Sequence, residues 1–238
     1  MPDSPRAPDA AHERLRDAYA RRQVVAYAWH APSHVYIIQE RVRMTMAMLR
    51  AHGLGNLAEL RILDVGCGQG YWVRELIQWG ADPGRVTGVD LLQERLDTAA
   101  RLSPAATRWV LGSGADLPFP DGSFDLVLQS TVFSSVLERE VRDRIAREIG
   151  RVLAPAGALL WYDFTYDNPR NPDVTGMPRG EIRRLFPGWA MDLRRVTLAP
   201  PIARRLPVFL YPLLYPVLSA LRFLRTHYLG ILRSPAGA

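Results

Sequence analysis

The stretch that decides the fold is Ile62-Leu63-Asp64-Val65-Gly66-Cys67-Gly68-Gln69-Gly70. It consists of a short apolar run, an acid and three glycines at alternate positions, and residues 71–79 after it are typical of a helix. A strand that leads through a glycine-rich turn into a helix presents backbone N–H groups to a ligand. Gly66 and Gly68 permit dihedral angles that a Cβ would forbid, and Gly70 lets the helix begin close to the strand. The stretch therefore predicts an α/β sheet that binds a ligand at this turn.

The spacing of the glycines argues against a dinucleotide site. A dinucleotide-binding turn follows G-x-G-x-x-G/A, and its third small residue would fall at Tyr71, which is bulky. A nicotinamide-dependent oxidoreductase is therefore the less favoured of the ligand-binding alternatives.

The bulk composition is that of a globular protein. The chain has 238 residues and a net charge of +6, and each of its 30 basic residues is an arginine. Without an aromatic-rich RNA-binding motif, we interpret this charge as solvated surface and expect no nucleic-acid partner. The single cysteine, Cys67, excludes an internal disulfide and fits a reducing compartment. With no signal peptide visible, we expect a cytoplasmic protein.

Strand and helix patterns alternate along the middle of the chain, which is typical of a parallel sheet with helices on both faces. Strands are expected at 61–65, 85–90, 107–111, 124–129, 158–164, 191–198 and 227–233. Helices are expected at 71–79, 93–102, 138–153 and 181–186, and residues 155–157 read as a turn. The carboxyl ends of such parallel strands line one edge of the sheet, where ligands bind.

The flanks predict additional helical parts. We divide the chain into a disordered tail at 1–11, a helical cap at 12–56 and a main domain at 57–238 with a helical insert near 200–225. The apolar run 208–221 is broken by Pro212 and Pro216 and is shorter than the roughly 20 residues of a membrane span. Two interpretations of residues 200–232 remain: a buried hairpin or lid over the sheet, or a segment in peripheral contact with the inner face of a membrane.

Asp90 lies 20 residues beyond Gly70, at the end of the second expected strand. An acid at this place accepts hydrogen bonds from the ribose hydroxyls of an adenosine-containing ligand.

Four motifs then occur together: I-L-D-V-G-C-G-Q-G, V-T-G-V-D-L-L, A-D-L-P-F-P-D-G-S-F-D-L-V and R-V-L-A-P-A-G-A-L-L-W-Y-D-F. In order and separation they resemble the class I S-adenosylmethionine-dependent methyltransferases. The flanking segments I-Q-E-R (38–41), T-V-F-S-S (131–135), N-P-R-N-P (168–172) and R-T-H-Y-L-G (225–230) resemble a methyltransferase type 11-like bacterial subgroup often met among glycan-biosynthesis genes. The resemblance implies a Rossmann-like, mostly parallel seven-stranded sheet.

The resemblance also implies S-adenosylmethionine as the cofactor and names its contacts. Asp116 would accept from the adenine amine, and Ala115 or Leu117 would supply main-chain and apolar contacts. Gln129 would lie beside the methionine portion. The full set of expected cofactor-binding residues is Asp64, Gly66, Cys67, Gly68, Gly70, Asp90, Leu91, Ala115, Asp116, Leu117 and Gln129. Within it, Cys67 is interpreted as a small residue of the turn, and Asp64 as a carboxylate that orients the turn.

The implied reaction is transfer of a methyl group to a nucleophile, for which the protein supplies alignment, water exclusion and a general base. Candidate bases are Asp163, His30 and His34, each of which has a structural alternative, Asp163 as an anchor of the following loop. No metal-ligand cluster is visible in the sequence.

The acceptor is the least determined part of the prediction. Tyr162, Tyr166 and Arg170 could line its pocket, and an arginine there would suit a carboxylate or phosphate. O-methylation of a small-molecule, glycan or lipid-linked acceptor is expected from the subgroup resemblance. The alternative is a non-catalytic scaffold or binding domain with the same fold.

Overall fold

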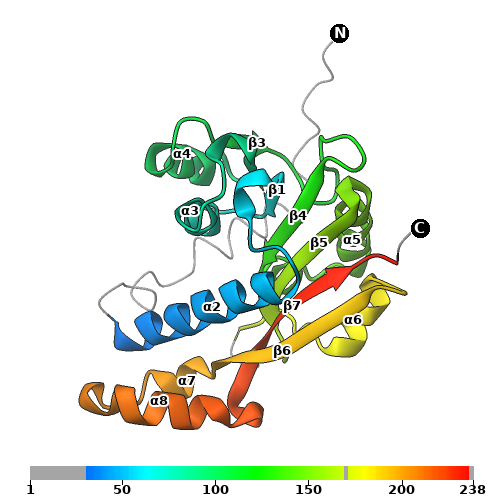
Figure 1. The fold of residues 1–238 in the computed structure, drawn as a ribbon. Coiled ribbons are helices and arrows are strands. Elements are labelled where there is room, and N and C mark those ends of the chain that lie inside the picture. The colour runs from blue at the N-terminus through cyan, green and yellow to red at the C-terminus, as the bar shows by residue number, and fades with distance from the viewer. Residues whose placement is uncertain (1–30, 169–170, 236–238) are drawn as a thin grey trace.

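The computed structural model describes residues 31–168 and 171–235. Its centre is a seven-stranded sheet in the order β3-β2-β1-β4-β5-β7-β6 (Figure 1). The first five strands are parallel, whereas β7 runs antiparallel to both of its neighbours. The strands are β1 (Ile62–Val65), β2 (Val86–Asp90), β3 (Arg108–Leu111), β4 (Phe124–Ser130), β5 (Leu153–Phe164), β6 (Ala190–Leu198) and β7 (Arg225–Arg233). This confirms the predicted α/β, Rossmann-like sheet.

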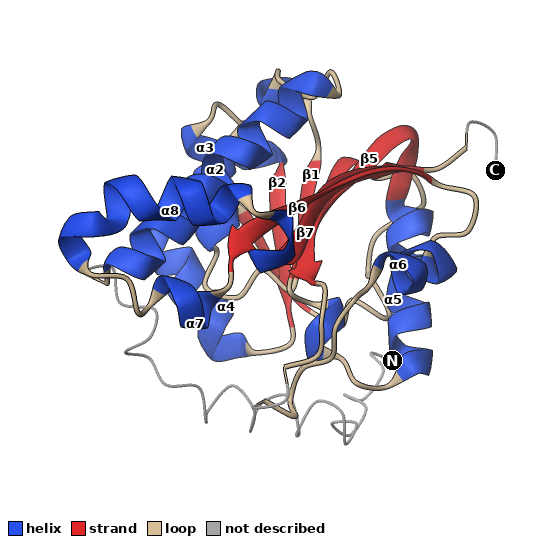
Figure 2. Ribbon diagram, turned by 90° about the horizontal axis from the view of Figure 1, so that it is seen from below, coloured by secondary structure: helices blue, strands red, loops and turns tan. Residues whose placement is uncertain are grey.

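Helices cover both faces of the sheet (Figure 2). One face carries α2 (Pro32–Ala51), α3 (Tyr71–Gln78) and α4 (Gln93–Leu102), and the other carries α5 (Arg139–Val152) and α6 (Arg179–Leu185). Successive strand residues alternate between the two cores: Ile62 packs with the first set of helices and Leu63 with the second. Because both faces are buried, the parallel strands read as continuous apolar runs.

The strand order creates a switch point between β1 and β4. From β1 the chain moves outward to β2 and β3, and then returns to the other side of β1 with β4 and β5. Val65 and Gln129 are register partners at the carboxyl ends of β1 and β4. A crevice outside two strands that diverge in this way is where open α/β sheets bind ligands.

The C-terminal insert lies outside α2. It consists of α7 (Pro200–Ala203), α8 (Tyr211–Ala220) and the 3-10 turns η5 (Val208–Leu210) and η6 (Arg222–Leu224), and α8 runs beside α2 in both views. The predicted helical insert is thus present. Across the described ranges, no helix is both long enough and apolar enough to cross a bilayer.

The start of β5 is the strand boundary that differs most from the sequence-based prediction. Strand β5 begins at Leu153, five residues before its predicted start, so the turn predicted at 155–157 lies inside the strand. The backbone is crowded there, since a Cβ on Gly157 would lie 2.9 Å from the Ala154 carbonyl oxygen. The pairing of β4 with β5 is also irregular at this point, because its register shifts between Phe124 and Leu126. The predicted tail at 1–11 and the part of the predicted helical cap up to residue 30 lie outside the described residues.

Candidate functional site

The glycine-rich turn after β1 has the backbone that its sequence predicts. Gly66, Gly68 and Gly70 all have positive φ, at 68°, 55° and 73°. A Cβ on Gly70 would lie 2.6 Å from the ring of Trp109 on β3, so this glycine allows α3 to begin against the sheet. A Cβ on Gly68 would meet only the Arg95 side chain, at 3.8 Å, so its surroundings leave room for a ligand.

Asp90 holds this turn in place. One carboxylate oxygen accepts from the Gly68 N–H at 2.8 Å and the other from the Leu92 N–H at 3.0 Å. Each oxygen retains a further acceptor position, so the predicted hydrogen bonds to ribose remain compatible with this geometry. Asp90 thus makes the contact with the turn that was expected of Asp64, and the role of Asp64 in orienting the turn stays a prediction.

Arg41 of α2 projects into the same edge of the sheet. Its Cζ lies 3.4 Å from the ring centroid of Tyr162 on β5 and 3.9 Å from that of Trp72 on α3. Its Nη2 donates to Ser130 Oγ at 2.6 Å, at the end of β4. Burial lowers the pKa of the guanidinium to about 10, and nearby Tyr162 opposes that shift, so Arg41 remains a cation at neutral pH.

Three buried polar atoms at this edge have no hydrogen-bond partner in the described part of the chain: Arg41 Nε, Asp64 Oδ1 and Gln129 Nε2. Such groups are costly unless something satisfies them. Burial, reinforced by Asp90, raises the pKa of Asp64 well above its usual range, while Arg41 opposes that rise. One cation, one acceptor and one amide donor at the switch point fit a ligand that carries both an ammonium and a carboxylate, as S-adenosylmethionine does.

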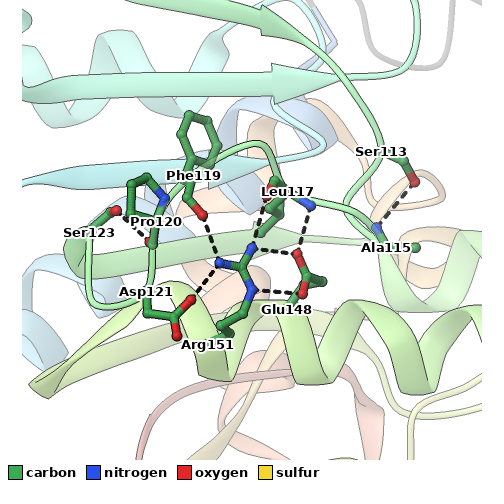
Figure 3. A network of polar contacts seen from close by, with 9 residues as sticks. All are labelled: Ser113, Ala115, Leu117, Phe119, Pro120, Asp121, Ser123, Glu148 and Arg151. Atoms are coloured by element: carbon green, nitrogen blue, oxygen red, sulfur yellow. Dashed lines mark hydrogen bonds and ion pairs between the residues drawn. The ribbon is translucent and has the colours of Figure 1, made fainter. Parts of the chain in front are cut away.

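The loop that would contact adenine is held from α5 (Figure 3). Arg151 donates to the carbonyl oxygens of Leu117 and Phe119, at 2.9 and 2.7 Å, and pairs with Glu148 at 2.7 Å. The Leu117 N–H donates to Glu148 at 2.8 Å, and the Ala115 N–H donates to Ser113 Oγ at 3.1 Å.

These hydrogen bonds leave fewer residues that fit the predicted contacts to adenine. The Leu117 N–H is occupied and its side chain is buried, so Leu117 does not fit the role of a main-chain donor. Ala115 still fits that role, because the Ser113 hydroxyl can rotate away. Asp116 is exposed at the rim, as an acceptor for an amine requires, and Leu91 is half-buried beside Asp90.

Cys67 is a small buried residue of the turn, as interpreted from the sequence. Burial and the neighbouring Asp64 raise the pKa of its thiol, which therefore stays protonated and is a poor nucleophile.

Asp163 does not have the geometry of a general base. It is fully buried, and its two oxygens accept from the backbone N–H groups of Ser134 and Phe164, at 3.1 and 2.9 Å. Burial raises its pKa to about 7. A base must reach the proton that it removes, so the catalytic prediction is not supported. The carboxylate instead anchors Ser134, in the segment after β4, rather than the loop that follows β5.

The histidine candidates receive no support as bases. His30 lies outside the described residues. His34 lies in the first turn of α2, seven residues and about 10 Å along the helix from Arg41. Burial lowers the pKa of His34. The polar side chains described above surround Arg41 and therefore lie well away from His34 along α2.

The segment that follows β4 connects the turn to a cavity. Thr131 has φ 58°, a strained conformation for a β-branched residue. Val132 then lies against Gly66, since its Cγ2 would be 2.6 Å from a Cβ there. The next residues form the 3-10 turn η4 (Phe133–Ser135), and the Ser134 carbonyl accepts from the Thr175 N–H at 2.9 Å.

Beyond η4 the cavity has a volume of about 450 Å³. Its lining includes Tyr166, as predicted for the acceptor pocket, and two arginines of α5, Arg139 and Arg142. Its acids are engaged: Asp167 accepts from Gly176 and Thr175, and Glu181 pairs with Arg184 and also with Arg142 of the same lining. Of the other predicted lining residues, Tyr162 is buried against Thr197 and Arg170 lies outside the described residues.

Sequence reasoning missed Arg41, Glu148 and Arg151 as site residues. The signal for Arg41 was present in the I-Q-E-R segment, where a charged pair interrupts a helix that packs on the sheet. Arg151 opens the quoted motif R-V-L-A-P-A-G. In each case the residue belongs to a recognisable segment of the sequence, but its hydrogen-bond partner lies 31 to 89 positions away in the chain.

Comparison with known proteins accords with this geometry. Residues 63–161 match the methyltransferase domain family. The chain is 29% identical over 157 residues to 2-methyl-6-phytyl-1,4-hydroquinone methyltransferase of Synechocystis, covering 64% of this chain and 48% of that protein. It is 38% identical over 112 residues to a fatty-acid O-methyltransferase of Mycolicibacterium smegmatis, covering 46% and 39%.

A solved structure is similar over almost the whole chain. This is 1,6-didemethyltoxoflavin-N1-methyltransferase of Burkholderia thailandensis with bound 1,6-didemethyltoxoflavin and S-adenosylhomocysteine, with a TM-score of 0.60 and 20% identity over 96% of this chain and 93% of that one. The curated relatives are only partly covered, because the chain spans about half of their length or less.

Proposed function

Because the chain belongs to the class I S-adenosylmethionine-dependent methyltransferase family, we propose that it transfers the methyl group of S-adenosylmethionine to an oxygen atom of a small-molecule acceptor. The observation that carries the proposal is the set of unsatisfied polar atoms at the β1–β4 switch point, immediately beside a glycine turn held by Asp90. The ammonium of the donor would pair with Asp64, and its carboxylate with Arg41. The ribose hydroxyls would bind Asp90.

Bound S-adenosylmethionine supplies a methyl group on a positively charged sulfur. Held by Asp64, Arg41 and Asp90, it would give that methyl group to the acceptor oxygen and would keep the electron pair of the carbon–sulfur bond. The protein contributes alignment, which can be worth roughly 7–11 kcal/mol of the barrier. The buried ring of Trp72 and the Arg41–Tyr162 stack keep this edge of the sheet shielded from water.

The acceptor class follows from the cavity beyond η4 and from the lack of an accessible base among the described candidates. A carboxylate or phosphate oxygen is already ionised at neutral pH and needs no base to remove a proton. Arg139, the exposed arginine of the lining, would hold such an anion. The fatty-acid O-methyltransferase relative acts, by its name, on an acceptor of this kind. Lipid-linked or glycan-linked anions are the finer candidates.

The test begins with the donor. Calorimetric titration of the full chain with S-adenosylmethionine and S-adenosylhomocysteine should give micromolar binding, with no heat from NAD⁺. Asp90→Ala should abolish it. The matched control is Asp82→Ala, because Asp82 caps a Gly84 N–H at the other end of β2 with the same i,i+2 geometry. An intact fold that binds no adenosyl ligand at millimolar concentration would instead favour the scaffold function.

The acceptor is tested next with tritium-labelled methyl donor against fatty acids, phosphorylated lipids, hydroquinones and neutral sugars. Label in the anionic classes, reduced in Arg139→Gln, is the expected result. Label confined to neutral hydroxyl acceptors would contradict the anionic class while leaving methyl transfer intact.

A further inference from the structure

The insert presents an apolar outer face. Six large hydrophobic side chains between 208 and 223 are exposed, among them Phe209 at 81%, Phe223 at 71% and Leu213 at 64%. The outer face is defined as Val208, Phe209, Leu213, Val217, Leu221 and Phe223. Proteins that stay free in solution rarely expose so many neighbouring apolar side chains without a partner for them.

The opposite side of the same helix is firmly packed, so the exposure of the outer face is built into the fold. Tyr211, Tyr215 and Ser219 recur every four residues along α8 and are buried. Tyr215 donates to Glu40 of α2 at 2.8 Å, and Tyr36 of α2 packs against both tyrosine rings, at centroid distances of 5.1 and 5.2 Å. Figures 1 and 2 both place α8 at the border of the molecule, with α2 on its inner side. One side of the insert is therefore buried, and the other faces outward.

Charge identifies the kind of partner. Exposed arginines at 204, 205 and 222 border the outer face, and the sequence has no Asp or Glu after Asp192. Pairing this face with a second copy would bring like charges together, which opposes association. Apolar side chains bordered by basic ones without any acid are the composition of a segment that lies in the interface of an anionic membrane.

We propose that the outer face docks the protein on the surface of an anionic lipid bilayer, with Phe209, Leu213 and Phe223 among the acyl chains and the three arginines at the phosphate level. The docked helix is one helix away from the donor site, because Glu40 binds Tyr215 while the next residue, Arg41, reaches Ser130. Docking stands apart from the proposed methyl transfer, since it needs neither donor nor acceptor.

The experiment is co-sedimentation of the full chain with vesicles of phosphatidylcholine, with and without 30% phosphatidylglycerol. The chain should bind the anionic vesicles and lose binding as salt is raised. Leu213→Ser should weaken binding by about tenfold. Leu102→Ser is the matched control, because Leu102 is equally a helical leucine, 57% exposed, on α4; it should bind as the unaltered chain does.

A second measurement fixes the orientation. Phe209→Trp should give fluorescence that brominated acyl chains quench, whereas Leu102→Trp should not. Donor binding by calorimetry and circular dichroism would establish that each variant is folded.

Three results would overturn the inference: no binding to anionic vesicles at 0.1 M salt, equal loss in the Leu213 and Leu102 variants, or a dimer in light scattering that Leu213→Ser dissociates. The last would assign the face to a second copy of the chain.

Discussion

The role assigned to Arg41 makes a prediction that separates donor binding from folding. In Arg41→Met the ring stack with Trp72 and Tyr162 keeps an apolar filling, while the cation and its hydrogen bond to Ser130 disappear. A hydrogen bond to a charged group contributes about 1.5–3 kcal/mol. If Arg41 binds the donor carboxylate, the Kd for S-adenosylmethionine should therefore rise by roughly 10- to 150-fold.

The free energy of unfolding should change much less than this. The lost hydrogen bond and ring contacts are offset by the removal of a buried charge, which costs several kcal/mol to desolvate. Asp64, whose pKa is already raised, can take up a proton when its cation is removed. Because protonation neutralises the Asp64 carboxyl, no unpaired charge is left buried, and replacing both charges of a buried pair by neutral groups is often near neutral; we expect a net loss below about 2 kcal/mol.

Calorimetry for the donor and urea unfolding for stability provide the assay. Arg41→Lys and Ser130→Ala serve as controls: the lysine keeps a charge without the planar stack, and the alanine removes only the hydrogen bond within the protein. A Kd for Arg41→Met within twofold of the unaltered chain, together with a stability loss above 3 kcal/mol, would refute the reasoning and make Arg41 a structural residue only.

Two further predictions concern the turn and the core. Gly70→Ala should lower the free energy of unfolding by about 1–3 kcal/mol and weaken donor binding, because its Cβ would meet the Trp109 ring in a left-handed conformation. Gly53→Ala, with the same φ of 73° and open space around it, is the control, and equal losses in urea unfolding would contradict the steric argument. Burial, with a smaller effect of Arg41, lowers the pKa of His227 to about 3, so the folded chain binds one proton fewer than the unfolded chain below pH 6.5. This residue's stability contribution is complete above pH 6.5 and declines by about 1.4 kcal/mol per pH unit below it; His227→Phe should flatten that slope in urea unfolding between pH 6 and 4.5, and an unchanged slope would show that His227 is not buried as a neutral group.

Much of the fold was predictable because its signals are local. The glycine turn, the position of Asp90 and the alternating apolar runs each specify a backbone conformation within a few residues. Strand ends therefore agree to within one or two residues, except at Leu153, where a pinched backbone extends β5 through a predicted turn. Turn residues indicate a bend, but only the pairing partner decides whether the bend interrupts a strand.

The roles of polar side chains were less predictable. The sequence assigned Asp64 to the orientation of the turn, Asp90 to the ribose and Asp163 to catalysis. The structure gives Asp90 two backbone donors, the N–H groups of Gly68 and Leu92, and leaves Asp64 with an unsatisfied oxygen. It also buries Asp163, whose carboxylate accepts hydrogen bonds from the backbone N–H groups of Ser134 and Phe164. A carboxylate can act as a base only where a ligand can reach it, whereas a buried carboxylate serves as a structural anchor. Whether a carboxylate is accessible depends on segments that are remote from it in the chain.

The sequence by itself determined the α/β class and the glycine turn, because these depend on short-range geometry and periodicity. The adenosyl donor was implied by the resemblance of its motifs to the class I S-adenosylmethionine-dependent methyltransferases. Only the tertiary structure decided that Arg41 reaches Ser130 at the end of β4, that Asp163 is buried and that one side of the insert faces outward. Each of these outcomes comes from contacts between residues about 30 to 175 positions apart. Such contacts form only when the sheet brings its neighbours together, so no local pattern encodes them.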